Sequence, residues 1–314
     1  MRVLITGGTG YLGRAVVRAI AARRHEPVVF ARHATTSGLP GILVDGDVRD
    51  RAAIQRAAAS CDAICHMAAL VSIWRRRAQD FDDVNVGGLQ HVIDVARASR
   101  IPRVLYTSSF LALPPAGCST PIEANDYQRT KVAADGLAEI AGRHDVPLIR
   151  VYPGVVYGPG RLTEGNLVGR LIDDHRKGRL PGLIGLEHVW SYSFVNDVAA
   201  AHCAALELGR IGVRYILGGE NATQKQMFTV IQQLTGRPVP RRIPYALASA
   251  IGALEECRVR VLGGRPLLTR GAVEIFRYDW PLDSGVASRE LGYTITPLAD
   301  GLRQTVETID ASCP

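Results

Sequence analysis

Through its first half the chain alternates short apolar runs with longer stretches in which apolar residues recur every three or four positions. The first run, Arg2 to Thr6, leads into a glycine-containing turn and then into a helical pattern that begins at Tyr11. Short apolar runs predict buried strands, and the longer spacing predicts amphipathic helices. Strands that alternate with helices favour an α/β protein whose parallel sheet is doubly wound, with helices on both faces.

The same patterns predict where the later elements lie. Strands are expected at 27–32, after 41, at 62–69, 103–109, after 147, after 191 and at 213–219, and helices at 50–59, 79–99, from 127, 166–177, up to 209, 223–235, 245–262, 284–291 and from 298 to the end. Beyond residue 160 the alternation loosens and helices come to dominate. We therefore expect a dinucleotide-binding domain over 1–160, completed by about 189–217, and a smaller, mostly helical substrate lobe over 161–188 and 218–314.

The turn after the first strand carries glycines at Gly7, Gly10 and Gly13. Glycine tolerates positive φ and lets a phosphate approach the backbone, and the following helix offers its positive N-terminal end to that charge. The GxxGxxG spacing differs by one residue from the usual dinucleotide fingerprint, but its strand-before, helix-after context matches. A dinucleotide site is the favoured interpretation, and a plain tight turn is the alternative.

The end of the second predicted strand suggests which dinucleotide is bound. NAD-preferring folds usually place an acidic residue there for the ribose hydroxyl, whereas this chain has Phe30, Ala31, Arg32 and His33. A guanidinium can bind a 2′-phosphate, which a carboxylate would repel. We therefore expect NADP, with NAD possible, and Arg32 as the phosphate ligand.

Tyr127 and Lys131 stand four residues apart at the start of a predicted helix, on one face. A phenol has a pKa near 10, and a neighbouring ammonium is expected to lower that pKa toward general acid or base duty. Ser108 and Ser109 follow the fifth predicted strand, at the sheet edge where catalytic groups of such folds gather. The pair and the hydroxyls together suggest a site for a carbonyl compound or an alcohol.

The composition of the chain argues against several classes of binding partner. The chain has 47% hydrophobic residues, 21% charged residues and a net charge of +7, but its densest basic clusters, 75–77 and 241–242, have no aromatic platform for nucleic acid. No apolar run is long enough for a membrane span. Six cysteines without metal-ligand spacing suggest no metal site and a reduced compartment. With the first strand at residue 2, we expect a cytoplasmic protein without a targeting segment.

Several ordered motifs, spread over nearly the whole chain, resemble those of one family. They are TGGTGYLG (6–13), GDVRD (46–50), HMAA (66–69), NVGG (85–88), YTSS (106–109), YQRTK (127–131), YPGVVYGPG (152–160) and FVNDVA (194–199). Together they resemble the extended short-chain dehydrogenase/reductases of the NAD-dependent epimerase/dehydratase family, and most of all its dihydroflavonol-4-reductase-like branch. The resemblance implies a Rossmann fold, a nicotinamide cofactor and possible pairing into a homodimer through a four-helix face.

The resemblance also implies roles for individual residues. Tyr127 would be the acid/base, Lys131 its electrostatic partner and ribose ligand, and Ser109 the hydroxyl that polarises the substrate oxygen. The expected cofactor-binding residues are Thr6, Gly7, Gly10, Tyr11, Leu12, Gly13, Arg32, Asp47, Val48, Ala68, Lys131, Tyr152, Pro153, Val155 and Val156. The chain departs from the family pattern at Tyr152, where Arg is common, and in a Ser-to-Tyr loop shorter than that of many sugar-nucleotide members.

The favoured function is reduction of a ketone or aldehyde by NADP(H). A mostly apolar substrate is expected from a candidate wall that consists of Phe110, Leu111, Leu113, Val156, Leu183, Ile184, Trp190 and Tyr192, although several of these could equally be core residues. One alternative is a nucleotide-sugar epimerase or dehydratase, with Arg161, Arg170 and Arg176 on the pyrophosphate. A second alternative is a non-catalytic NADP-binding regulator.

Overall fold

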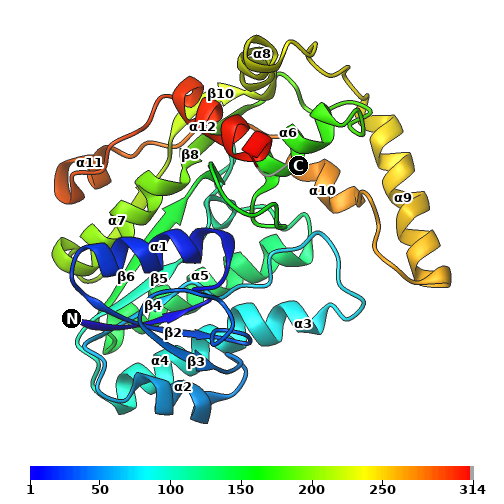
Figure 1. Cartoon of the computed structure of the whole chain (residues 1–314). Coiled ribbons are helices and arrows are strands. Elements are labelled where there is room, and N and C mark those ends of the chain that lie inside the picture. Colours follow the sequence, from blue (N-terminus) through cyan, green and yellow to red (C-terminus); the bar gives the residue numbers. More distant parts are fainter. Residues whose placement is uncertain (312–314) are drawn as a thin grey trace.

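The computed structural model describes residues 1–311 and contains a central sheet of seven parallel strands in the order β3-β2-β1-β4-β5-β6-β9 (Figure 1). Its strands are β1 (Arg2–Thr6), β2 (Glu26–Ala31), β3 (Ile42–Asp45), β4 (Ala63–His66), β5 (Val104–Thr107), β6 (Leu148–Pro153) and β9 (Arg214–Leu217). The order runs outward from β1 on both sides, so the expected doubly wound α/β fold is confirmed. The neighbouring strands β1, β4 and β5 are parallel, so their carboxyl ends lie side by side and position the candidate site.

Helices cover both faces of this sheet. They are α1 (Tyr11–Ala22), α2 (Arg51–Ala58), α3 (Gln79–Phe81), α4 (Gly88–Ala98), α5 (Asp126–His144), α7 (Val195–Leu208) and α11 (Gly285–Leu291). One buried cluster joins the sheet to α1, α7 and α11, and a second joins its other face to α2, α4 and α5. Burial of these two apolar faces is the main driving force that holds the layers together.

Side-chain caps fix where several helices begin. The Asp50 carboxylate accepts from the Ala53 N–H at 3.0 Å, and the Asn125 side chain accepts from the Gln128 N–H at 2.9 Å. Each cap satisfies an N–H group that would otherwise lack a partner at a helix start. The cap on Asn125 sets the first turn of α5, and with it the direction in which Tyr127 projects.

A smaller sheet forms the framework of the second part of the molecule. It consists of β7 (Val155–Tyr157), β8 (Val189–Phe194) and β10 (Glu220–Thr223), with β8 parallel to β7 and antiparallel to β10. The helices of this part are α6 (Leu167–Arg176), α8 (Gln224–Thr235), α9 (Tyr245–Leu262), α10 (Arg270–Ile275) and α12 (Leu298–Ala311). A third buried apolar cluster lies here. The mostly helical C-terminal region is therefore confirmed.

Three elements of this part were not predicted from the sequence. One strand was expected after residue 147, and the structure divides it into β6 of the large sheet and β7 of the small one. The β10 segment ENAT is polar and short, and it becomes a strand because it pairs with Trp190 and its neighbours on β8. Helix α10 spans six residues, too few for a clear apolar period. The predicted last helix is confirmed from Leu298 to Ala311, and the rest of that prediction lies outside the described residues.

The helix expected at 79–99 is interrupted by a π-helical stretch, Asp82–Gly87, between α3 and α4. The residues at both junctions keep right-handed helical dihedral angles, so the chain continues without a break. A π turn rotates the side chains that follow it relative to a regular helix, and such turns often occur at functional sites. Here the stretch contains Asn85, which is buried.

Within residues 1–311, no helix is both long and apolar enough to cross a membrane. The same residues contain no group of three or more His, Cys, Asp and Glu side chains arranged to hold a metal ion.

Candidate active site

The glycine turn joins β1 to α1 and leaves no room for side chains. Gly7 has φ +73°, and a Cβ there would lie 2.7 Å from the backbone of Ala68. A Cβ on Gly13 would lie 2.3 Å from the Gly7 carbonyl oxygen. Helix α1 begins at Tyr11, and its N-cap residue Gly10 has no side chain, so the first N–H groups of the helix remain available to an anion.

Basic groups gather beside this turn. Arg14, in the first turn of α1, donates one N–H to the Ser37 carbonyl at 3.2 Å, while its Nε is buried without a partner. Burial lowers the pKa of the Arg14 guanidinium, and the nearby Arg161 and Arg18 lower it further. An anion bound here would satisfy the Nε and relieve the repulsion between the cations. The turn, the uncapped helix and these cations together fit the pyrophosphate of a dinucleotide.

Thr6 ties the ends of β1 and β4 together. Its Oγ1 lies 2.7 Å from His66 Nδ1 and accepts from the N–H groups of Met67 and Ala68, each at 3.3 Å. Burial lowers the pKa of His66 to about 3, so this imidazole is neutral. These bonds hold the backbone at Ala68 against the glycine turn, where a cofactor backbone contact was expected.

Tyr127, Ser109 and Lys131 are brought together at the carboxyl end of β5. Ser109 follows β5, and its side chain lies close enough to the hydroxyl of Tyr127, in the first turn of α5, to lower the pKa of that phenol. Lys131 lies one turn further along α5 and is 5% exposed; its Nζ donates to the Thr107 carbonyl at 3.0 Å. A hydroxyl, a phenol and an amine thus lie around one corner of the sheet, as expected for polarising and protonating a substrate oxygen.

The electrostatics of the pair differ from the prediction that Lys131 lowers the pKa of Tyr127. Burial raises the pKa of Tyr127 to about 12, and the hydrogen bond from Ser109 offsets only part of that effect. Burial also lowers the pKa of Lys131 to about 8, against the opposing influence of Asp135. Desolvation therefore dominates the pKa of the phenol, and Tyr127 is protonated at neutral pH.

The side chains of the adjacent residues Ser108 and Ser109 point to different partners. Ser108 Oγ donates to the Asp135 carboxylate at 2.9 Å, whereas Ser109 faces Tyr127. The hydroxyl of Tyr152 donates to the other Asp135 oxygen at 3.0 Å. Successive side chains of an extended segment point in opposite directions, which explains the split. The Tyr152 side chain is fully buried in this network, so only its backbone could face a cofactor.

Sequence reasoning missed two residues that position this site. Asn85 accepts from the Leu70 N–H at 2.7 Å and donates to Thr130 Oγ1 at 2.9 Å, so it links the loop after β4 to α5. Asp135 lies one turn after Lys131 and is 8% exposed. The NVGG motif and the Lys131–Asp135 spacing of four were the available signals, but neither reveals a partner that is distant in the sequence.

At the expected adenosine end, Arg32 is exposed just after β2. Asp47 accepts three hydrogen bonds from Arg49, which lower the pKa of its carboxyl group, and the adjacent Val48 is buried. Asp45, which the register places opposite Ala31, accepts from the N–H and hydroxyl of Thr35 at 3.0 and 2.6 Å. The charge of Arg32 helps to lower the pKa of Asp47, and the Arg32 side chain is exposed to solvent.

The remaining expected cofactor residues lie where the two parts of the molecule meet. Tyr11 donates its hydroxyl to the Gly158 carbonyl at 3.0 Å, across the junction between α1 and the segment after β7. Leu12 is half-buried in the first turn of α1. Pro153 ends β6, while Val155 and Val156 belong to β7, of which only Val156 is more than marginally exposed.

Most of the expected substrate wall is core. Phe110, Leu111, Leu183, Trp190 and Tyr192 are buried in the third apolar cluster, and Leu113, Val156 and Ile184 are half-buried. A small apolar pocket touches this cluster, lined by Val155, Leu167, Val168, Leu171, Trp190, Tyr192, Gln224, Met227 and Phe276. Its free space of about 10 Å³ holds about one water molecule. The hydroxyl of Tyr192 is buried beside it without a hydrogen-bond partner.

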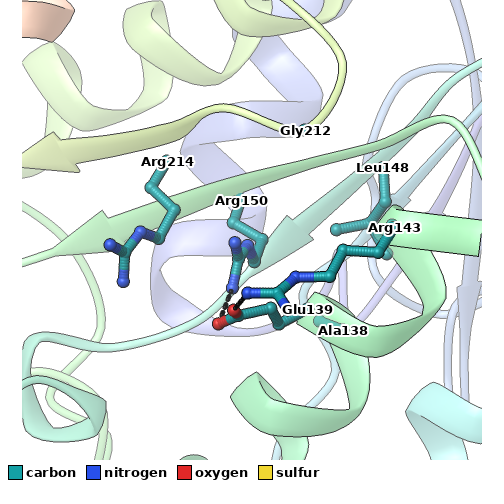
Figure 2. A pocket seen from close by; sticks show the side chains of 8 residues that line it. Ala138, Glu139, Arg143, Leu148, Arg150, Gly212 and Arg214 are labelled. Carbon is teal, nitrogen blue, oxygen red and sulfur yellow. Dashed lines mark hydrogen bonds and ion pairs between the residues drawn. The ribbon is translucent and has the colours of Figure 1, made fainter.

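A pocket of about 280 Å³ lies elsewhere, at the amino ends of β6 and β9 (Figure 2). It is lined by Ala138, Glu139, Gly142, Arg143, Leu148, Arg150, Gly212 and Arg214. Figure 2 shows Glu139 between the guanidinium groups of Arg143 and Arg150, with which it forms ion pairs. Because this pocket opens at the amino ends of the strands, whereas Ser109 lies at their carboxyl ends, the pocket is separate from the candidate active site.

The arginines expected for a sugar-nucleotide pyrophosphate do not form one group of free cations. Arg176 forms an ion pair with Asp310 of α12. Arg161 and Arg170 are exposed, and Arg161 lies near Arg14, beside the glycine turn.

Comparison with known proteins places this arrangement in a family. The model of the NAD dependent epimerase/dehydratase family matches residues 3–218. The chain is 33% identical to sterol demethylase protein B of Methylococcus capsulatus, over 94% of each chain. It is 28% identical to the 2-alkyl-3-oxoalkanoate reductase of Stenotrophomonas maltophilia, over 97% of this chain and 98% of the relative.

Among solved structures, UDP-glucose 4-epimerase of Thermotoga maritima superposes with a TM-score of 0.82 at 20% identity, over the full length of both chains. This likeness confirms the fold, while the family model and the relatives carry the assignment to an enzyme family. The chain belongs to the NAD-dependent epimerase/dehydratase family and is an extended short-chain dehydrogenase/reductase.

Proposed function

We propose that this enzyme reduces a ketone or aldehyde group of a mostly apolar substrate, with NADPH as the reductant. The observation that carries the proposal is the convergence of Ser109, Tyr127 and Lys131 at the carboxyl end of β5. When bound, the cofactor supplies hydride to the carbonyl carbon. The protein's own task is then to hold that carbonyl and to protonate its oxygen.

Tyr127 is suited to be the proton donor. Its pKa of about 12 keeps the phenol protonated at neutral pH, so a proton is available when negative charge develops on the substrate oxygen. Ser109, whose side chain lies near the phenol, would donate to the same oxygen. Lys131, whose pKa is lowered to about 8, would hold the ribose and stabilise the phenolate left after proton transfer.

The first 160 residues, completed by about 189–217, would hold the cofactor, and 161–188 with 218–314 would hold the substrate. Thr6, Gly7, Gly10, Gly13 and Ala68 supply the pyrophosphate cradle, and the uncapped start of α1 supplies its N–H groups. The exposed guanidinium of Arg32 favours the 2′-phosphate of NADP, because it can give that phosphate charge-assisted hydrogen bonds.

An apolar substrate agrees with the surroundings of Tyr127. The phenol packs against the third apolar cluster, which contains Phe110 and Trp190. The unpartnered hydroxyl of Tyr192 would supply one polar contact in an otherwise apolar wall. The names of the relatives, a sterol demethylase protein and an alkyl-oxoalkanoate reductase, point to the same chemical class.

The test is Tyr127→Phe, assayed on a panel of apolar ketones and aldehydes with NADPH and NADH in parallel. Turnover is expected to fall about a thousandfold, while cofactor affinity stays within about twofold. Tyr215→Phe is the matched control, since the buried ring of Tyr215 lies on β9 and its hydroxyl donates a hydrogen bond to Glu290. Equal turnover in the wild type and Tyr127→Phe contradicts the proposal.

The panel also includes UDP- and dTDP-sugars, because Arg161 and Arg170 remain without ion-pair partners among the described residues. An epimerase oxidises and re-reduces its substrate within one turnover and consumes no free NADPH. Conversion of a nucleotide sugar without NADPH consumption would replace the reductase proposal.

A further inference from the structure

Helix α9 carries apolar residues on its outer side as well as on its inner side. Six large apolar residues between positions 247 and 267 are exposed: Leu247 (53%), Ile251 (39%), Leu254 (71%), Val261 (82%), Leu262 (78%) and Leu267 (86%). We call these six residues the α9 outer face. Within the helix, the first four recur at steps of four, three and seven and Leu262 follows directly, which places these five within one side, while Leu267 lies in the loop after the helix.

The packing of α9 does not explain this face. The helix contacts α10 through its opposite side, where Ala248, Gly252 and Val259 are buried. Gly252 lies so close to the backbone of Thr269 and Arg270 that a Cβ would come within 3.0 Å. In Figure 1, α9 stands at the margin of the molecule, away from both sheets. An apolar face of this size on a protruding helix indicates an interaction surface.

The surrounding charge is strongly positive. Residues 241–270 contain six arginines and two glutamates, a net charge of +4 out of +7 for the whole chain. Arg258 and Arg270 form ion pairs with Glu255 and Glu256, and Arg265 forms one with Glu164. Arg241, Arg242 and Arg260 are exposed and have no ion-pair partner among residues 1–311. The α9 outer face therefore suits a partner with a negatively charged surface and an apolar layer below that surface.

We propose that the α9 outer face docks this enzyme onto an anionic membrane surface. Val261, Leu262 and Leu267, its most exposed members, lie at the far end of α9 and in the loop that follows, where they can enter the lipid interface as a protruding tip. The unpaired arginines would lie at the headgroups. A second copy of this chain fits less well, because it would bring a second charge of +4 against the first.

The surface has a structural route to the catalytic helix. Helix α9 packs on α10, and Gly271 of α10 lies against the Ala124 carbonyl, where a Cβ would come within 2.2 Å. Ala124 directly precedes Asn125, the cap of the helix that carries Tyr127. Docking through α9 would therefore hold the lobe beside the active site close to the lipid. The docking itself does not depend on the proposed reductase activity.

The test is co-sedimentation of the full chain with vesicles of phosphatidylcholine alone or mixed with about 30% phosphatidylglycerol. The wild type is expected to sediment with the anionic vesicles and to be released by high salt. Val261→Ser/Leu262→Ser should weaken this binding about tenfold or more, because two exposed apolar side chains no longer enter the lipid. Leu208→Ser/Ile211→Ser is the matched control, with side chains 63% and 52% exposed on another surface.

Arg241→Ser/Arg242→Ser should weaken binding to the anionic vesicles only. Failure of the wild type to bind them, or equal binding by the α9 double variant and the control, overturns the proposal. A concentration-dependent dimer in sedimentation velocity that Val261→Ser/Leu262→Ser abolishes would assign the face to a second copy instead. Turnover of a water-soluble ketone by Val261→Ser/Leu262→Ser, expected to equal that of the wild type, separates docking from the proposed reaction.

Discussion

At the scale of single residues, burial decides the chemistry of the candidate site. Desolvation shifts the pKa values of the Tyr127 phenol and the Lys131 amine toward their neutral forms. The Ser109 hydroxyl moderates the first shift, and the charge of Asp135 moderates the second. The two serines after β5 differ for a similarly local reason. Ser109 meets the phenol, and Ser108 satisfies a buried carboxylate.

Ser109→Ala and Ser108→Ala should therefore have opposite effects. Ser109→Ala is expected to lower kcat about a hundredfold, because it removes a donor to the substrate oxygen, and to cost about 1 kcal/mol of stability, because Ser109 Oγ also accepts from the Leu111 N–H. Ser108→Ala should keep most of the turnover but lose about 1–3 kcal/mol of stability, since Asp135 loses a buried hydrogen bond. Steady-state kinetics and urea unfolding measure both. A larger kcat loss in Ser108→Ala would reverse the assignment.

Lys131 should make stability depend on pH in a defined window. Its pKa falls from 10.5 in the unfolded chain to about 8 in the folded one, so the unfolded state binds more protons between these values. The burial cost is complete below pH 8 and disappears as the pH rises toward 10.5. Relative to Lys131→Met, the wild type should gain about 2 kcal/mol in free energy of unfolding between pH 7 and 9.5. Parallel denaturation curves for the two proteins would contradict this shift.

At the scale of elements, close backbone approach shapes the candidate cofactor turn. In the structure, a side chain at Gly7 or Gly13 would collide with neighbouring backbone atoms, which explains why these positions are glycine. The sequence pattern could only suggest that the turn needs glycine. Asn85 illustrates the converse: the π-helical stretch that carries it breaks the expected helical period, so its link between Leu70 and Thr130 could not be read from the sequence.

Gly13→Ala should destabilise the protein by about 2 kcal/mol or more and weaken NADPH binding, because its Cβ would lie 2.3 Å from the Gly7 carbonyl oxygen. Gly136→Ala is the control, an exposed position in α5 where a Cβ meets nothing within 4 Å. That change should stabilise the protein by about 0.5–1 kcal/mol through helix propensity. Calorimetry and cofactor titration would check both, and equal effects would refute the steric argument.

At the scale of the whole molecule, the two sheets are connected too tightly to act as separate bodies. β8 of the smaller sheet ends at Phe194, and α7, which packs on the large sheet, begins at Val195 without a loop. The chain then returns through β9 to the large sheet and through β10 to the small one. Unfolding of either sheet would therefore disrupt the packing of elements in the other.

We accordingly expect one unfolding transition. In a Trp74→Phe background, the remaining tryptophans, Trp190 and Trp280, report on the third apolar cluster, whereas far-ultraviolet circular dichroism reports on the whole chain. The two urea midpoints should coincide, because unfolding is cooperative when elements share their packing. A fluorescence transition that precedes the loss of helix would show that the smaller sheet unfolds independently.

The sequence by itself determined the doubly wound sheet, the glycine turn and the presence of Tyr127 and Lys131 on one helix face, because these follow from periodicity and from contacts close in the chain. Only the tertiary structure decided which serine faces the phenol, that desolvation sets the pKa values of the pair, and that the expected substrate wall is largely core. It alone also brought Asp135, Asn85 and β10 to their partners and left one side of α9 uncovered. Burial and long-range pairing depend on segments distant in the sequence, and no local pattern contains them.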